Sequence, residues 1–259
     1  MKLGFIGMGN MATALARGFV ASGKVAPADL YAFDPAAEKL AQMAAEIGFT
    51  AVQSERELAA ASDMVIMACK PYHVEGALTA MGAALSGKAL LSIALGWDHA
   101  KYRALVASDV RVQFVMPNTP AMVGEGMFLF EQTTSFTAEE LAFATDLLAA
   151  IGVVETLPSN LMGIGGALSG CGPAFVDLMI EAFADAGVLY GLPRDKAYKL
   201  VSQTVKGSAK LQQETALHPG ALKDMVCSPA GSTIKGVAAL EQNCFRGAAI
   251  AAIEAIMEN

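Results

Sequence analysis

KLGFIGMGNMATALARGF, residues 2–19, joins an apolar run, a glycine-containing turn and an amphipathic stretch. Gly7, Gly9 and Ala12 have the spacing GxGxxA, directly after a predicted strand and at the start of a predicted helix. In this setting Gly7 permits a tight turn, Gly9 lets a pyrophosphate approach the backbone, and Ala12 allows close contact between helix and strand. A glycine turn that only packs a helix onto a sheet has the same spacing, but the strand–turn–helix context favours dinucleotide binding.

Beyond this segment, short apolar runs alternate with helical patterns up to about Glu155. We predict strands near 2–6, 29–33, 63–68, 88–93, 110–115, 126–130 and 152–156. We predict helices near 9–22, 35–47, 54–60, 72–84, 98–106 and 138–150, the last one starting at a Thr137–Glu140 capping box. Strands that alternate with helices indicate an α/β fold with a parallel, doubly wound, Rossmann-like sheet.

After Leu157 and Pro158 the alternation stops, and the remaining pattern is helical. The sequence therefore predicts two domains, a dinucleotide-binding one over 1–157 and an all-helical one over 158–259. Five glycines between Gly163 and Gly172 interrupt the helical pattern, and we expect them to serve close backbone packing or a ligand.

The predicted helix from Pro173 to about Tyr190 is apolar on nearly every face. Only Asp177, Glu181 and Asp185 break this pattern, and their spacing places them on one stripe. A helical domain of this size cannot cover such a helix on all sides, so we expect a partner subunit to do so. The charged stripe argues against a membrane span.

The composition limits the possible partners. A net charge of −7 disfavours a nucleic-acid or anionic-membrane partner, since both reward a basic surface. The four cysteines are widely spaced and the three histidines form no close pair, so neither a metal site nor a disulfide framework is expected. Because Met1 is followed directly by a strand pattern rather than a signal peptide, we expect a cytoplasmic protein.

Asp34 follows the second predicted strand, where an acidic residue takes the adenosine ribose hydroxyls and repels a 2′-phosphate. No arginine lies beside it in the sequence, and the nearest cation is Lys39. Asp34 precedes Pro35, so it is also a good helix N-cap, and the two roles can coexist. We predict NAD(P)H as the cofactor, with NADH preferred.

A second informative stretch, LKDMVCSPAGSTIKGVAALE, covers residues 222–241. Ser228 before Pro229 predicts a helix start, with Ser228 as the cap and the N–H groups of the next three residues free to bind an anion. Gly231 would allow close approach of a ligand, and the hydroxyls of Ser228, Ser232 and Thr233 would lie at the same place. This arrangement suits a small carboxylate, although an ordinary capped helix has the same pattern.

This stretch resembles the signature of pyrroline-5-carboxylate reductases. The resemblance begins with KLGFIGMGNMATALARGF and continues through MACKP (67–71), VMPNTP (115–120) and LSGCGPAF (168–175). Two positions depart from the family pattern: Ala230 stands at a usual glycine and Cys171 at a usual serine. The first would narrow the carboxylate pocket, and the second would alter only helix packing.

The resemblance implies hydride transfer from NAD(P)H to the C=N bond of 1-pyrroline-5-carboxylate, giving L-proline. It also implies a homodimer, with a higher assembly of dimers left open. It implies substrate contacts from Val226, Ser228, Gly231, Ser232 and Thr233, with Thr233 catalytic at the ring nitrogen. It implies cofactor contacts from Ile6, Gly7, Met8, Gly9, Asn10, Met11, Asp34, Ala68, Cys69, Lys70, Pro71, Asn118 and Pro120.

Some roles and alternatives stay open at this point. Lys70 faces the cofactor ribose, the substrate or solvent, whereas Cys69 is expected to be a buried thiol rather than a nucleophile. A related reductase of a hydroxy acid or another cyclic imine is one alternative, but such enzymes place a lysine where this chain has Asp177 and Glu181. A non-catalytic nucleotide sensor is another, and it would not require the carboxylate pocket.

Overall fold

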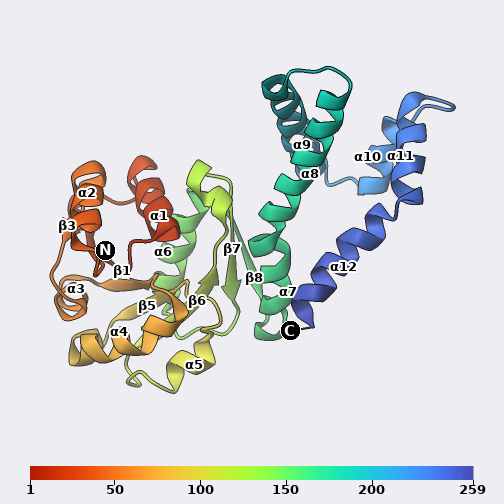
Figure 1. Ribbon diagram of the computed structural model, residues 1–259. Helices are drawn as coiled ribbons and strands as arrows, with labels where there is room; N and C mark the ends of the chain where they lie inside the picture. The colour runs from red at the N-terminus through yellow and green to blue at the C-terminus, as the bar shows by residue number, and fades with distance from the viewer. Residues whose placement is uncertain (259) are drawn as a thin grey trace. The chain divides into compact units, whose positions relative to one another are not determined.

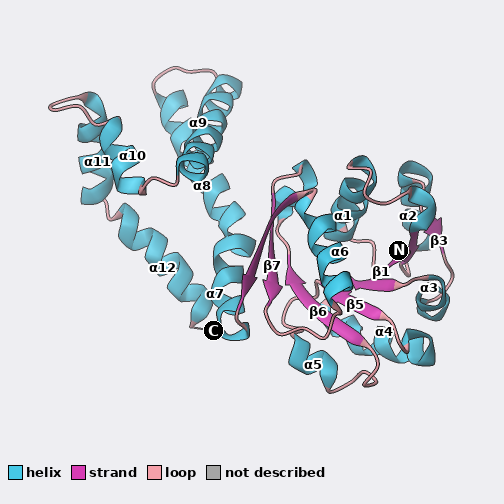
Figure 2. Ribbon diagram, turned by 180° about the vertical axis from the view of Figure 1, so that it is seen from behind, coloured by secondary structure: helices cyan, strands magenta, loops and turns pink. Residues whose placement is uncertain are grey.

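The computed structural model describes residues 1–258. The chain forms two compact units, one that ends at Gly170 and a second that begins at Cys171. The first unit contains all the strands of the described residues, and the second is built from helices and connecting turns (Figures 1 and 2). The α/β organisation expected from the alternating pattern, followed by a helical region, is therefore confirmed.

The first unit is built on an eight-stranded sheet with the order β3-β2-β1-β4-β5-β6-β7-β8. The strands are β1 (Leu3–Ile6), β2 (Leu30–Phe33), β3 (Thr50–Ala51), β4 (Met64–Met67), β5 (Ala89–Ser92), β6 (Arg111–Met116), β7 (Gly126–Glu131) and β8 (Gly152–Leu157). Every neighbouring pair is parallel except β6 and β7. Only a short 3-10 helix, η4 (Thr119–Val123), joins these two strands, and a connection of that length reverses the chain instead of crossing over the sheet.

Helices cover both faces of this sheet (Figure 1). They are α1 (Asn10–Ala21), α2 (Ala37–Ile47), α3 (Glu55–Ala61), α4 (Val74–Met81), α5 (His99–Arg103) and α6 (Ala138–Ala149). One core joins the sheet to α1, α2 and α6, and a second core joins it to α3, α4 and α5. Predicted helices near 72–84 and 98–106 are shorter in the structure, because their flanks form 3-10 turns or irregular chain.

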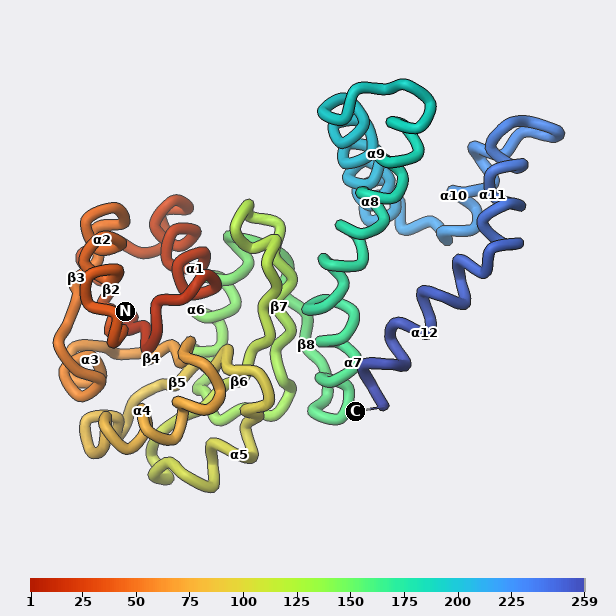
Figure 3. The backbone as a smooth tube through the Cα atoms, viewed as in Figure 1, coloured from red at the N-terminus to blue at the C-terminus, as the bar shows by residue number. Residues whose placement is uncertain are grey.

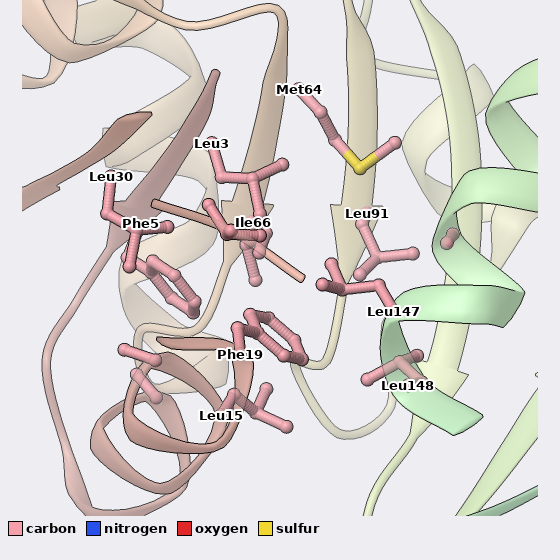
Figure 4. Packing of buried hydrophobic residues seen from close by; sticks show 14 of the residues in the cluster. Leu3, Phe5, Leu15, Phe19, Leu30, Met64, Ile66, Leu91, Leu147 and Leu148 are labelled. Carbon is pink, nitrogen blue, oxygen red and sulfur yellow. The ribbon is translucent and has the colours of Figure 1, made fainter. Parts of the chain in front are cut away.

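Strand residues alternate between the two cores, as a sheet buried on both faces requires. In β4, Met64 and Ile66 enter the first core, whereas Val65 and Met67 enter the second. Leu15 and Phe19 of α1 point from the helix toward the sheet in Figure 4, and both are fully buried. This packing fixes the start of α1 against the end of β1, where the glycine turn lies.

The glycine-rich stretch before the second unit is helical, with α7 (Met162–Gly166) followed by a π-helical turn over Ala167–Cys171. A Cβ atom on Gly165 would lie 2.5 Å from Leu157 Cδ1, and one on Gly166 would lie 2.3 Å from Met116 Sδ. The expectation of close packing is therefore confirmed at these two glycines.

The second unit consists of α8 (Gly172–Leu189), α9 (Arg194–Thr215), α10 (Pro219–Met225), α11 (Ser232–Gln242) and α12 (Phe245–Met257). Helices α8 and α9 pack against each other, and α11 packs against α12 (Figure 3). Among its described residues, the only buried apolar side chains are Ala184 and Ala197. Leu178 is 65% exposed and Phe183 is 45% exposed, so this unit presents a large apolar surface.

The helical stretch Ser159–Leu189 is long and apolar enough to cross a membrane by length and composition alone, and 11% of its apolar window is buried. The core helix of a soluble protein meets the same criteria, so this finding alone is weak evidence for a membrane span.

Candidate active site

The turn after β1 can only be made by glycine at its first position. Gly7 has φ +89°, which is strained for any residue with a side chain. Its N–H donates to the Phe33 carbonyl oxygen at 2.8 Å, and a Cβ atom would lie 2.9 Å from the Cα and N of Cys69. The turns that follow β1 and β4 therefore touch, with β2 beside them, at the carboxyl end of the parallel strands.

The start of α1 is open for an anion. Its N-cap is Gly9, which provides no side-chain cap, and the first turn carries no acidic residue. A Cβ atom built on Gly9 would meet nothing within 4 Å. The backbone N–H groups of the first turn, beginning at Asn10 and Met11, lack partners within the helix, so a phosphate can approach them closely.

Asp34 joins the end of β2 to the glycine turn. Its Oδ2 accepts a hydrogen bond from the Met8 N–H at 2.8 Å, and its Oδ1 accepts one from the Ala36 N–H at 2.9 Å. The N-cap of α2 is Ala36, so the hypothesis that Asp34 is a helix N-cap is wrong. Asp34 instead closes a tight local turn, and each carboxylate oxygen keeps a lone pair that a ribose hydroxyl can use.

The turn after β4, Ala68–Pro71, lies at the same edge of the sheet. Ala68 donates its N–H to the Ile6 carbonyl oxygen at 2.9 Å, which aligns this turn with the glycine turn. Burial raises the pKa of the Cys69 thiol to about 11, so the thiolate is scarce at neutral pH and the thiol is a poor nucleophile. Lys70 is exposed. One contact of this turn has no counterpart in the sequence patterns, namely a hydrogen bond from the Trp97 indole Nε1–H to the Pro71 carbonyl oxygen at 3.0 Å.

Asn118 lies after β6, and Pro120 follows it in η4. The Asn118 side chain is 9% exposed and makes two bonds inside the first unit. Its Oδ1 accepts from the Met127 N–H at 2.8 Å, and its Nδ2 donates to the Ser169 carbonyl oxygen at 3.0 Å. Half of its hydrogen-bonding capacity therefore holds three segments together, and one amide hydrogen and one oxygen lone pair remain for a ligand.

The segment after α10 differs from its prediction. Helix α11 begins at Ser232 with Gly231 as its N-cap, so the prediction that Ser228 caps a helix starting at Pro229 is wrong. Ala230 has φ +61°, and this left-handed residue makes the chain turn before the helix starts. The Gly231 N–H donates to the Ser228 carbonyl oxygen at 3.0 Å, so it is not the free donor that was expected.

Gly231 leaves room for the Ser228 hydroxyl. A Cβ atom there would lie 2.5 Å from Ser228 Oγ and 3.1 Å from the Ser228 carbonyl oxygen, so a side chain at this position would displace the serine hydroxyl. No side chain caps α11, and its first turn has no acidic residue. The N–H groups of Ser232 and Thr233 are thus available, and the Ser228, Ser232 and Thr233 side chains are exposed beside them.

Both candidate binding points are therefore helix N-termini with a glycine N-cap and no competing carboxylate. One, at Gly9, lies in the first unit, and the other, at Gly231, lies in the second. In the described residues, no three His, Cys, Asp or Glu side chains group as metal ligands. The glycine turn, the open start of α1 and the doubly wound sheet define a dinucleotide-binding domain of the Rossmann type.

Comparison with known proteins identifies the family. Residues 2–96 match the family model described as NADP oxidoreductase coenzyme F420-dependent, and residues 159–259 match the one for pyrroline-5-carboxylate reductase dimerisation. The chain is 39% identical to the pyrroline-5-carboxylate reductase of Escherichia coli, over 99% of this chain and 96% of that protein. It is also 39% identical to the enzyme of Treponema pallidum, over the whole of both chains.

A solved structure agrees with these relatives. The crystal structure of the Plasmodium falciparum pyrroline carboxylate reductase with NADP bound has a TM-score of 0.90 at 34% identity, covering 100% of this chain and 96% of that one. The chain therefore belongs to the pyrroline-5-carboxylate reductase family.

Proposed function

We propose that this protein reduces 1-pyrroline-5-carboxylate to L-proline, with NAD(P)H as the hydride donor. The observation that carries the proposal is the open N-terminus of α11, where Ser228, Ser232 and Thr233 lie in the segment that resembles the family signature. Full-length similarity to enzymes named for this reaction supports it.

The chemistry needs few catalytic groups. A cyclic imine protonated on nitrogen is already electrophilic, so the protein mainly has to hold its carbon in place and grip its carboxylate. A reduced nicotinamide supplies the hydride when bound. We assign the carboxylate to the Ser228 hydroxyl and the Ser232 N–H, and the ring nitrogen to Thr233 Oγ. Gly231 shapes the turn, and Val226 borders it as the C-cap of α10.

The cofactor is assigned to the first unit. We propose that the open start of α1 holds the pyrophosphate and that Asp34 accepts the adenosine ribose hydroxyls. A 2′-phosphate placed there would meet a carboxylate already fixed by Met8 and Ala36, so NADH is the preferred donor. Ala68, Cys69, Lys70, Pro71, Asn118 and Pro120 complete the proposed cofactor contacts.

The proposed oligomeric state is based on the second unit. We propose a cytoplasmic homodimer in which residues 158–259 form both the dimer contact and the substrate site, while 1–157 bind the cofactor. The match to a dimerisation family over 159–259 and the exposed apolar side chains of α8 support this division.

Two hydroxyl deletions test the substrate assignment. Thr233→Ala should mainly lower kcat, because its hydrogen bond matters most as the nitrogen becomes an amine. Ser228→Ala should mainly raise KM for the imine, because the carboxylate is present in both ground and transition states. The loss of one hydrogen bond to a charged group should change the affected constant, kcat or KM, by about ten- to a hundredfold. Steady-state kinetics on both variants measures this.

Neither hydroxyl caps α11, so both variants should keep the wild-type melting temperature. Thr215→Ala, which removes a hydroxyl from α9, is the matched control and should change neither constant. Variants at Ser228 and Thr233 that melt early but turn over normally would show that this segment is structural, and the assignment would be wrong.

A further inference from the structure

The only tryptophan of the chain, Trp97, lies between β5 and α5. Its indole Nε1–H donates to the Pro71 carbonyl oxygen at 3.0 Å. Pro71 ends the Ala68–Pro71 turn that follows β4, and β4 and β5 are neighbouring parallel strands. The indole therefore links two successive loops at the carboxyl edge of the sheet, the edge at which the cofactor is proposed to bind.

Trp97 is itself anchored. Its ring lies against the ring of Tyr102, with centroids 5.2 Å apart, and Tyr102 is completely buried. The Tyr102 hydroxyl is hydrogen-bonded to Ser92 Oγ at 2.7 Å, and that oxygen also accepts from the Ala94 N–H at 3.2 Å. The indole thus packs against a buried aromatic ring at the end of β5, and this ring contact keeps its N–H in place.

The turn that receives this bond is fixed at its other end as well. The Cys69 backbone lies against Gly7, where a Cβ atom would be only 2.9 Å away. Pro71 O, at the far end, accepts both from Trp97 and from the Val74 N–H. Cys69 and Lys70 are held between these two points. Loss of the indole bond would leave the far end with the Val74 N–H as its remaining donor, so this end of the turn would be held less firmly, while the contact with the glycine turn would stay intact.

We propose that Trp97 is a positioning residue for the cofactor-binding turn. It acts through Pro71 and sets the conformation of Ala68–Pro71 for a dinucleotide. The inference rests on the proposed function, because the cofactor contacts of that turn come from it. Since the turn would serve the part of the cofactor common to NADH and NADPH, Trp97 affects both equally, unlike Asp34.

Trp97→Phe tests this directly, because phenylalanine keeps an aromatic ring against Tyr102 but has no N–H. One neutral hydrogen bond corresponds to about two- to tenfold in an equilibrium constant. We expect KM for NADH and for NADPH to rise by the same factor in this range, with kcat and KM for the imine within about twofold of wild type. The dissociation constant of NADH, measured by calorimetry, should rise in parallel.

Tyr102→Phe is the matched control. It removes the hydroxyl that bonds Ser92 but leaves the indole bond to Pro71, so it should lower the melting temperature without changing KM for either cofactor. A folded Trp97→Phe protein that binds NADH as tightly as wild type would overturn the proposal. So would an equal rise of the cofactor KM in Tyr102→Phe, because that would indicate general loosening.

A measurement on the wild-type protein covers the case in which Trp97→Phe does not fold. NAD⁺ binding should change the emission of Trp97 in a saturable way, with the same dissociation constant as calorimetry, and an unchanged emission would contradict the proposal. If the wild-type protein binds NADH but reduces no imine, the proposed function fails, while the binding tests of Trp97 remain decisive.

Discussion

At the residue scale, the proposed cofactor site assigns two roles to Asp34. Its carboxylate is proposed to accept the adenosine ribose hydroxyls, and it also holds the glycine turn through the Met8 N–H at 2.8 Å. We therefore expect a change at this position to affect both the selection between cofactors and the shape of the turn. The effect on cofactor selection can be separated from the effect on turn geometry by the choice of the residue that replaces Asp34.

Asp34→Ser should lower kcat/KM for NADH by about ten- to a hundredfold, because a charge-assisted contact to the ribose is lost. The value for NADPH should fall less, since the repulsion of a 2′-phosphate disappears, so preference shifts toward NADPH. Kinetics with both cofactors measures the shift, and Asp195→Ser on α9 is the charge-matched control. A wild-type protein that uses NADPH as well as NADH would contradict this account.

Residue patterns predicted the glycine turn correctly, because Gly7 has a geometric requirement that no other residue meets. They did not predict the turn before α11. Ser228 followed by Pro229 is compatible with both a helix start and a tight turn. The left-handed conformation of Ala230 produces the turn, and a positive φ at an alanine is not indicated by its neighbours in the sequence. The bond from Trp97 to Pro71 joins two loops far apart in sequence, so no spacing rule could indicate it.

At the element scale, the predicted strands and the Thr137 capping box were confirmed, because alternation and capping are local properties. The strand β3 was missed, since two residues are too short to show a period. The antiparallel direction of β7 was also missed, because it depends on the short connection through η4. The sequence pattern thus predicts the type of each element, but not the antiparallel pairing of β6 with β7.

The start of α6 contains a partly buried ion pair, and its contribution to stability can be tested by changing the pH. Glu140 accepts from Arg111 Nη2 at 2.6 Å and from Arg111 Nε at 2.8 Å and 2.9 Å, and it also completes the capping box. Burial by itself would raise the pKa of Glu140, but the hydrogen bonds from Arg111 and Thr137 bring it below its usual value. The charged form is therefore the one that stabilises the fold.

Glu140→Gln should lower the free energy of unfolding by about 1–3 kcal/mol at neutral pH, because the ion pair is lost while glutamine can still complete the capping box. The pKa of Glu140 is lower in the folded than in the unfolded protein. The deficit in the free energy of unfolding should therefore be complete above about pH 4.3, the pKa of an unperturbed glutamate, and should disappear as pH falls through the pKa of the folded protein. Denaturant unfolding across acidic pH measures this. Thr137→Ala, which removes only the cap, should show a deficit with much weaker pH dependence, and a pH-independent deficit in Glu140→Gln would contradict the assignment.

At the scale of the whole molecule, the second unit buries little apolar surface in a single copy. It buries only Ala184 and Ala197 among its described apolar side chains, while α8 exposes Leu178 and Phe183. A partner copy that covers this surface explains the exposure and agrees with the dimerisation family match.

Phe183→Asp should shift the protein from dimer to monomer and lower its melting temperature, because a charge would replace an apolar contact. Light scattering at micromolar concentration measures the mass. Leu105→Asp, at a 53% exposed site of the first unit, is the control and should leave the dimer intact. A wild-type protein that is a folded, active monomer at that concentration would contradict the dimer.

The most direct test of the central claim is the oxidation of NADH and NADPH by the wild-type protein, with and without 1-pyrroline-5-carboxylate, together with quantification of the product. We predict imine-dependent oxidation that forms one L-proline for each cofactor consumed, faster with NADH. A folded protein that oxidises neither cofactor when the imine is added, or that turns over a hydroxy acid or another cyclic imine more efficiently, would contradict the account.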